Sequence, residues 1–336
     1  MGTHLHMNTR IGRQAWLLVA LVLGTVAPAV VQAQNSPQAV PDNKAPRKYT
    51  HAPDLANVAY GPHQRNVLDL WKAKSDRPTP LVVHFHGGGF TQGDKTWISS
   101  ALLEICLQKG ISVATANYRY STQAPYPAQL QDSARAVQFL RSHAGEWNLN
   151  PKAVAVTGGS AGGVISMWLG FFDDMADPKS DDPVRRQSTR PTVIGPVDGQ
   201  STLDPRVAAK LIGEEATRWV GTFPASHLFG IPKGEDILKA QRAFPLYEEA
   251  SPINHLTADA TPVFTYYTNP PGPLPPRSHN DALHNIRFGY ALKEHMDKLG
   301  VECVLRHSGQ YTGDRQPQFY GEMVEFFLKY FPHEAK

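Results

Sequence analysis

The chain has 336 residues, of which 41% are hydrophobic and 10% aromatic, so it can bury a sizeable core as one large α/β domain or as two smaller domains. Its formal net charge is only +3 at pH 7, and it contains no run of lysines and arginines. Nothing in this balance argues for nucleic acid or an anionic membrane surface as a partner, and no nucleic acid partner is expected.

The first residues differ in kind from the rest. Arg10 and Arg13 precede an apolar run over residues 15–31, and small residues follow at the positions that a signal peptidase reads. We expect residues 1–33 to be an export signal that is cleaved after Ala33. The mature protein is then expected to be secreted or periplasmic.

A permanent transmembrane anchor is the competing interpretation of this segment. The apolar run contains Gly24 and Pro28 and is short for a hydrocarbon core of ~30 Å, so no stable membrane anchor is expected. Residues 34–53 are polar, contain prolines and lack periodicity, which predicts a linker. The folded body is therefore expected to span residues 54–336.

The body alternates strand and helix patterns. Residues 67–71 alternate apolar and polar side chains like an antiparallel edge strand, whereas residues 81–86 form a continuous apolar run like a strand buried on both faces. The same criteria predict further strands at 111–116, 154–156, 191–197, 262–267 and 301–307, and helices at 99–109, 130–142, 161–169, 285–299 and 321–330. This rhythm predicts a mostly parallel sheet with crossover helices.

The middle of the chain is harder to interpret. Residues 173–190 are rich in Asp, Pro and Arg, and residues 205–246 contain short helical pieces without a repeat. The stretch 173–257 is either a partial lid over the sheet edge or a set of surface connections. The sequence leaves both open.

Ser160 lies where an apolar strand pattern meets a helical one, in the pattern Gly158-x-Ser160-x-Gly162. Glycines on both sides allow strand and helix to crowd together, which exposes the hydroxyl at the positive end of a helix dipole. The pattern predicts a nucleophilic serine; an incidental serine in a glycine-rich turn is the alternative.

A second glycine-rich turn, residues 86–89, ends the strand at 81–86. Without side chains, its successive N–H groups can face a bound carbonyl oxygen, so Gly87, Gly88 and the N–H of Ala161 are predicted to form an oxyanion hole. The turn can also be only a tight connection, but its order relative to Ser160 favours the catalytic interpretation. We expect His86 to brace this turn rather than act as a base.

Taken together, these segments resemble the α/β-hydrolase superfamily, within it the esterase branch related to hormone-sensitive lipase and the small secreted carbohydrate esterases. The resemblance covers about residues 60–331 and is strongest before residue 165. The resemblance rests on the motifs at residues 86–90, 93–95, 117–121, 126–129 with Asp132, 158–163 and 251–252.

The resemblance implies a three-layer fold with a mostly parallel central sheet, helices on both faces and at most a small lid. It also implies a serine that is acylated by an ester and regenerated by water, without a metal or an organic cofactor. Gly159 departs from the branch, which usually has Asp there.

A serine becomes nucleophilic only with a base that takes its proton and an acid that orients the base, so both must be found in the sequence. The family places its acid soon after the strand at 262–267, but this chain inserts the proline-rich residues 269–276, and counting back from Gly300 makes Asp281 the candidate. A solvated loop aspartate is the alternative for Asp281.

The family's histidine follows the last strand, yet residues 308–316 contain none. His307 at the strand end is the candidate base, and a strand-end histidine paired elsewhere is the alternative. His279 and His284 on the inserted loop are reserves.

The leading hypothesis is a secreted serine esterase that acts on a small-molecule or polysaccharide ester. The alternative, motivated by the missing downstream histidine, is a catalytically impaired hydrolase-fold protein that binds a polysaccharide or an exported partner. Cys106 and Cys303 lie in apolar segments, and although export permits a disulfide, free buried thiols are favoured.

Overall fold

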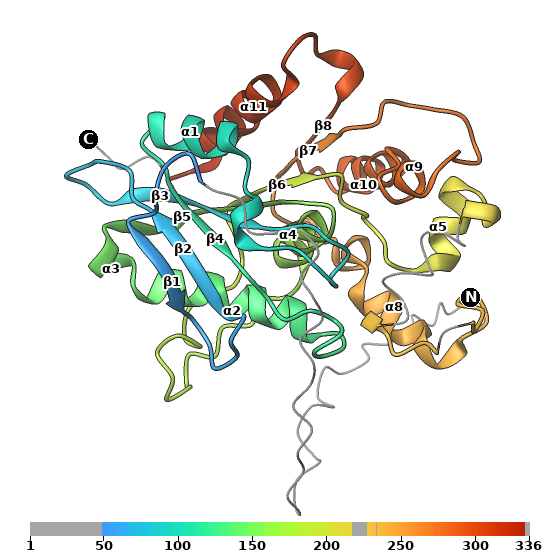
Figure 1. Cartoon of the computed structure of the whole chain (residues 1–336), viewed down its shortest axis with the longest axis horizontal. Coiled ribbons are helices and arrows are strands. Elements are labelled where there is room, and N and C mark those ends of the chain that lie inside the picture. The colour runs from blue at the N-terminus through green and yellow to red at the C-terminus, as the bar shows by residue number, and fades with distance from the viewer. Residues whose placement is uncertain (1–48, 217–226, 233, 333–336) are drawn as a thin grey trace, which may run out of the picture. The chain divides into compact units, whose positions relative to one another are not determined.

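The computed structural model describes residues 49–216, 227–232 and 234–332 (Figure 1). The expected signal segment 1–33 and most of the expected linker lie outside these residues, so both stay predictions. Among the residues described, no helix has the length and apolar character needed to cross a membrane.

A mostly parallel sheet forms the centre of the described part. Its order is β1-β2-β4-β3-β5-β6-β7-β8; β1 and β2 run antiparallel to their neighbours, and the other strands pair in parallel. The strands are β1 Leu55–Ala59, β2 Val67–Trp71, β3 Thr79–Phe85, β4 Ser112–Ala116, β5 Leu149–Gly159, β6 Val193–Val197, β7 Val263–Tyr267 and β8 Cys303–His307. The predicted parallel sheet is confirmed, but β1 was not predicted, and it occupies the edge expected for β2.

The inner strands are apolar throughout because both of their faces are covered. In β5, Val154 and Val156 belong to one buried core cluster, while Ala153 and Ala155 belong to another. Successive side chains of a strand point to opposite faces, so a continuous apolar run supplies both cores. The sheet therefore carries a helical layer on each side.

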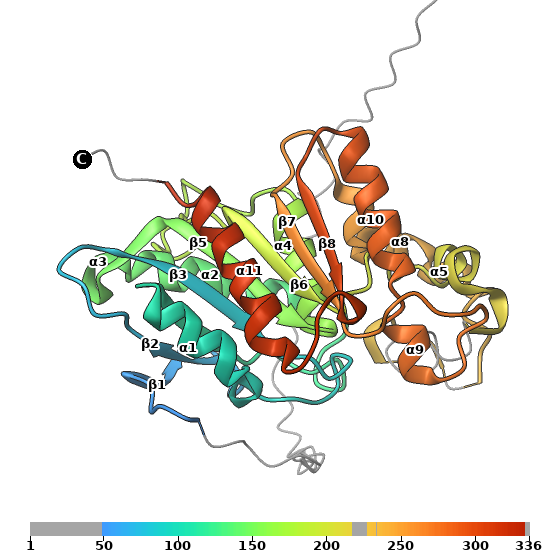
Figure 2. The ribbon, with the colours of Figure 1, turned by 90° about the horizontal axis from the view of Figure 1, so that it is seen from above.

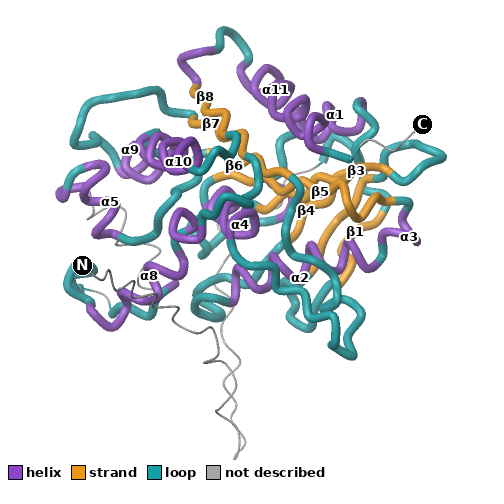
Figure 3. The backbone as a smooth tube through the Cα atoms, turned by 180° about the vertical axis from the view of Figure 1, so that it is seen from behind, coloured by secondary structure: helices purple, strands orange, loops and turns teal. Residues whose placement is uncertain are grey.

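The two helical layers are drawn from different parts of the chain. α1 and α11 lie side by side over one face (Figure 2), and α2 and α4 cover the other (Figure 3). The helices are α1 Ser100–Gln108, α2 Ala128–Ser142, α3 Ala144–Trp147, α4 Ala161–Phe171, α5 Pro205–Ile212, α8 Phe244–Ala250, α9 His279–Leu283, α10 Arg287–Lys298 and α11 Arg315–Tyr330.

The three-layer arrangement is as predicted. α11 begins earlier than expected because Asp314 caps it by accepting a hydrogen bond from the Gln316 N–H.

Residues 173–190 run along α2 rather than over the sheet edge. Arg135 forms an ion pair with Asp182, and Gln138 Nε2 donates to the Gln187 carbonyl at 2.8 Å. This stretch is thus a surface connection. Further on, α5 packs against α9 and α10 through a third core cluster that includes Ile212, Ala282 and Phe288.

Candidate active site

Ser160 sits on the turn between β5 and α4, with φ at +53°. This left-handed backbone is costly for a residue with a side chain and typically marks a functional turn. A Cβ on Gly162 would lie 2.0 Å from the carbonyl oxygen of Phe85, so only glycine lets the turn press against β3. The turn therefore presents the Ser160 hydroxyl at the carboxyl end of the sheet.

His284 is the histidine that reaches the nucleophile. Its Nε2 lies 3.0 Å from Ser160 Oγ, and its Nδ1 lies 3.0 Å from Oδ1 of Asn280, one helical turn earlier. His284 directly follows α9, a short helix whose N-cap residue Ser278 accepts a hydrogen bond from the Asp281 N–H. Burial lowers the pKa of His284, so the imidazole is neutral near pH 7 and able to accept a proton.

The structure does not bring His307, the predicted base, to Ser160. His307 ends β8, and the order of the sheet puts three strand spacings between β5 and β8, about 14 Å at the usual distance between strands. Its Nδ1 accepts a hydrogen bond from the Gly309 N–H at 3.2 Å. The side chain thus caps the turn after β8 instead of reaching back to Ser160.

Asp281 likewise lies away from the nucleophile. Its N–H donates to Ser278 Oγ, and its carboxylate is 3.4 Å from Asn269 Nδ2. It lines a separate cavity of about 200 Å³ beside the proline-rich loop. The structure therefore does not bring Asp281 to Ser160 as the predicted acid.

The carboxylate near the nucleophile is that of Asp198, directly after β6. Asp198 is 7% exposed and shares a cavity with Ser160. Its two oxygens accept hydrogen bonds from the N–H and the Oγ1 of Thr268, at 2.7 and 2.8 Å. Its charge acts on His284, where it raises the pKa and partly offsets the effect of burial, while its own pKa is raised by burial.

Asp198 was missed, although a signal for it existed. It is the first residue after the predicted strand 191–197, and that strand lies beside β5 in the sheet. Polar side chains at the carboxyl ends of adjacent parallel strands converge at one edge. The sequence alone therefore places Asp198 at this edge of the sheet. Choosing Asp198 over Asp281 required knowing the path of the later loop in the folded chain.

Gly87 lies against the serine. A Cβ at this position would be 3.5 Å from Ser160 Cβ and 2.8 Å from the Gly159 carbonyl oxygen. Ala161 is the first residue of α4, and an N–H at that position has no acceptor within its own helix. These two positions flank the serine from different segments, as an oxyanion hole requires.

His86 orients the glycine turn. Arg65 Nη2 can only donate, so its 3.2 Å contact makes His86 Nε2 an acceptor, and Nδ1–H then donates to the Gly87 carbonyl at 2.7 Å. Burial lowers the pKa of His86 to about 3, which keeps it neutral. Because the N–H of a trans peptide points opposite to its C=O, the Gly88 N–H is directed away from His86. His86 thus braces the turn, as predicted.

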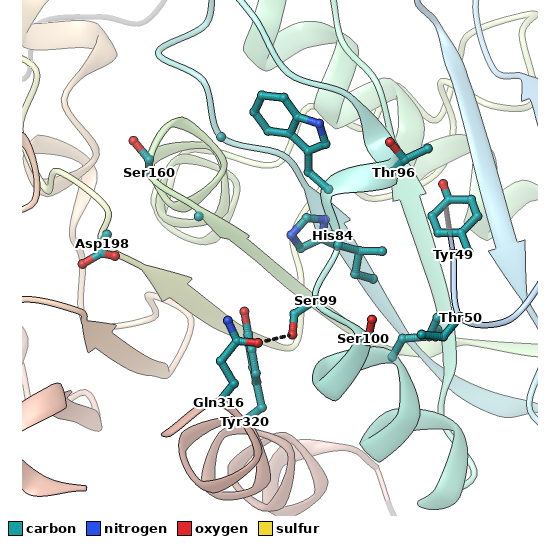
Figure 4. A pocket seen from close by; sticks show the side chains of 15 residues that line it. Tyr49, Thr50, His84, Thr96, Ser99, Ser100, Ser160, Asp198, Gln316 and Tyr320 are labelled. Atoms are coloured by element: carbon teal, nitrogen blue, oxygen red, sulfur yellow. Dashed lines mark hydrogen bonds between the residues drawn. The ribbon is translucent and has the colours of Figure 1, made fainter. Parts of the chain in front are cut away.

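A cavity of about 490 Å³ extends from Gly87, Ser160 and Asp198 toward Tyr49 and Thr50 (Figure 4). Its wall is rich in hydrogen-bonding side chains, which come from β3, the N-cap and first residue of α1, and the first half of α11. They include His84, Ser99, Ser100, Gln316 and Tyr320.

His84 lines this cavity and is buried. The Thr115 hydroxyl donates to the Lys95 carbonyl at 2.7 Å and therefore accepts from His84 Nδ1 at 3.4 Å. Nε2 is then the unprotonated nitrogen, and burial lowers the pKa of this histidine to about 4. Among the residues described, no group of three or more His, Cys, Asp or Glu side chains is arranged to hold a metal ion.

The order of the strands, together with a histidine-bonded serine on the strained turn after β5, places the protein among the α/β-hydrolases. Within this class, the chain belongs to the BD-FAE family, whose family model matches residues 68–270, more than half of the chain.

Two mycobacterial proteins illustrate the similarity in sequence. The Mycobacterium tuberculosis protein named "Probable carboxylic ester hydrolase LipM" is 27% identical over 295 residues, which cover 84% of this chain and 62% of LipM. Esterase LipQ of the same species is 24% identical over 229 residues, 65% of this chain and 49% of LipQ. The chain thus spans less than two thirds of the length of these relatives.

Solved structures share the fold. An acetyl ester-xyloside bifunctional hydrolase from Caldicellulosiruptor lactoaceticus aligns with a TM-score of 0.61 and 21% identity, covering 79% of this chain and 89% of that one. A truncated carbohydrate esterase from gut microbiota aligns with a TM-score of 0.64 and 19% identity, covering 85% and 99%. At these identities the likeness concerns the fold alone.

Proposed function

We propose that the protein is a serine esterase that is exported from the cytoplasm and hydrolyses carboxylic esters through an acyl-enzyme. The observation that carries this proposal is the 3.0 Å contact between His284 Nε2 and Ser160 Oγ. The esterase names of the sequence relatives support the reaction class. The apolar N-terminal segment before Ala33 supports export.

In the proposed reaction, neutral His284 takes the Ser160 proton as the oxygen attacks the ester carbonyl. The N–H groups of Gly87, Gly88 and Ala161 stabilise the oxyanion, and the charge of Asp198 stabilises the imidazolium. His284 then gives the proton to the departing alcohol, and a water molecule releases the acid by the same steps. General base catalysis contributes about 10²- to 10⁴-fold, and each oxyanion donor about 10²- to 10³-fold.

For the substrate, we propose an ester with a short acyl group or a carbohydrate-linked ester. The hydrogen-bonding wall of the cavity at Ser160 supports a polar group next to the scissile bond. Two structural neighbours are named for acetyl ester, xyloside or carbohydrate substrates. A rate series over aryl esters of increasing chain length and over acetylated sugars tests this choice.

The test of the reaction compares Ser160→Ala, His284→Gln and His307→Gln. We expect Ser160→Ala to lose hydrolysis of p-nitrophenyl acetate and labelling by a fluorophosphonate probe, and His284→Gln to lose about 10²- to 10⁴-fold in kcat. His307→Gln is the matched control and should keep the parent rate. Undiminished hydrolysis by Ser160→Ala would remove the proposal.

The alternative of a catalytically impaired binding protein was motivated by the lack of a histidine after the last strand. The contact of His284 with Ser160 removes that motive. An intact, folded protein that binds glycans but fails to react with the fluorophosphonate would restore the alternative.

A further inference from the structure

We infer that Asn280 is the positioning residue for the base, so that orientation and charge come from two different side chains. Asn280 holds the His284 ring, and Asp198 supplies the negative charge. This inference rests on the proposed function and adds the neutral amide to the Ser160–His284 pair.

The role of His284 as a base fixes the position of its ring proton. To accept the Ser160 proton, His284 Nε2 must carry a lone pair, so the ring hydrogen is on Nδ1. The acceptor for that N–H in the structure is Oδ1 of Asn280, at 3.0 Å. An asparagine oxygen can only accept, so this contact selects the tautomer that catalysis needs.

Asn280 holds His284 through its backbone as well. The His284 N–H donates to the Asn280 carbonyl at 3.0 Å, so both the main chain and the ring of His284 are tied to one residue. The helix that carries Asn280 is anchored by Ala282, which is fully buried in the cluster with Ile212 and Phe288. The ring therefore has little freedom to turn away from Ser160.

Asp198 has different partners. Its two carboxylate oxygens accept from the N–H and hydroxyl of Thr268, so its position is set by the end of β7. It affects His284 through its charge, and the only other titratable group that acts on the ring, among the residues described, is His279, which lowers the pKa. Gln200 Nε2 donates to the Leu283 carbonyl at 2.8 Å, which fastens the loop after Asp198 to the end of α9.

The experiment measures kcat and KM for p-nitrophenyl acetate in Asn280→Ala, Asn280→Asp and Asn285→Ala. We expect Asn280→Ala to lower kcat by about 10- to 100-fold with little change in KM, because the ring loses orientation rather than substrate contact. Asn280→Asp retains an acceptor and should restore most of the rate. Its added negative charge raises the pKa of His284, so the acid limb of the pH profile moves to higher pH.

Asn285→Ala is the matched control, because Asn285 Oδ1 accepts from the Arg287 N–H rather than from the His284 ring. It should keep the parent kcat. Nitrogen-15 NMR of the His284 ring, assigned by its loss in His284→Gln, should report Nδ1–H in the parent protein and a tautomer mixture in Asn280→Ala.

Two results would overturn the inference. One is a parent-like kcat in Asn280→Ala; with Ser160→Ala inactive, the proposed function would survive while the role of Asn280 would not. The other is a loss in Asn280→Ala that Asn280→Asp does not rescue and that parallels a fall in the unfolding temperature, which would mean that Asn280 only stabilises α9. Activity that persists in Ser160→Ala would instead remove the proposed function.

Discussion

At the scale of single residues, burial sets the protonation of the histidines around Ser160. His284, His86 and His84 all have lowered pKa values, chiefly because the interior disfavours the imidazolium. For His86 and His84, neutrality preserves fixed hydrogen bonds in the turn and in the cavity wall. For His284, it makes a proton acceptor available.

The pH dependence of the reaction follows from this environment. Since the base must be unprotonated, kcat/KM should rise with pH through the pKa of His284, which lies below the ordinary value of about 6.5. The Asp198 charge favours imidazolium, so Asp198→Asn should move the acid limb to still lower pH and reduce kcat.

Asp281→Asn is the control for this prediction, because Asp281 lines a different cavity. Its pH profile should match that of the parent protein. If the acid limb of the pH profile moved in Asp281→Asn but not in Asp198→Asn, the carboxylate that acts on His284 would be Asp281 and not Asp198.

At the scale of elements, the site depends on how closely the turn at Ser160 approaches β3. The glycines of the turn differ sharply: a Cβ on Gly162 meets the Phe85 carbonyl oxygen at 2.0 Å, whereas a Cβ on Gly159 meets nothing within 4 Å. β3 pairs with strands on both sides, so it cannot move aside. The glycine requirement is therefore specific to position.

We expect Gly162→Ala to lower the free energy of unfolding by about 3 to 5 kcal/mol and Gly159→Ala to change it by less than about 1 kcal/mol. Urea unfolding followed by tryptophan fluorescence measures both. Similar midpoints for the two variants would show that contact with β3 does not determine the requirement for glycine.

At the scale of the whole molecule, the two cysteines lie in core clusters on opposite faces of the sheet. Cys106 on α1 belongs to the core cluster on one face of the sheet, and Cys303 on β8 belongs to the cluster on the other. Both are free and buried, as the sequence predicted, and burial raises the pKa of both thiols, to about 12 for Cys303. Neither is a reactive thiolate in the folded protein.

Thiol titration tests this arrangement. A disulfide-exchange reagent should label neither cysteine in the native protein and both in denaturant, and a reductant should leave the unfolding temperature unchanged. Rapid labelling of either thiol under native conditions, or a fall in unfolding temperature with reductant, would contradict the structure.

The sequence by itself determined the features that depend on neighbours along the chain. The continuous apolar runs of β3 and β5, the glycines around Ser160 and the turn at Gly87 each follow from local sterics and burial. Both strands were predicted, although β5 begins at Leu149, earlier than the predicted residue 154. The unpredicted strand β1 illustrates the limit, because its five residues are all exposed or half-buried and do not alternate apolar and polar side chains.

Only the tertiary structure decided which base and which acid accompany the serine. Ser160 and His284 are 124 residues apart in sequence, and their contact depends on the path that the chain takes through residues 269–278 before α9. Asp198 directly follows a predicted strand, whereas Asp281 lies beyond the proline-rich residues 269–276, and choosing between them required the path of the folded chain. A hydrogen bond between side chains of distant elements is set by how those elements pack, so the partners of Ser160 could be read only from the folded chain.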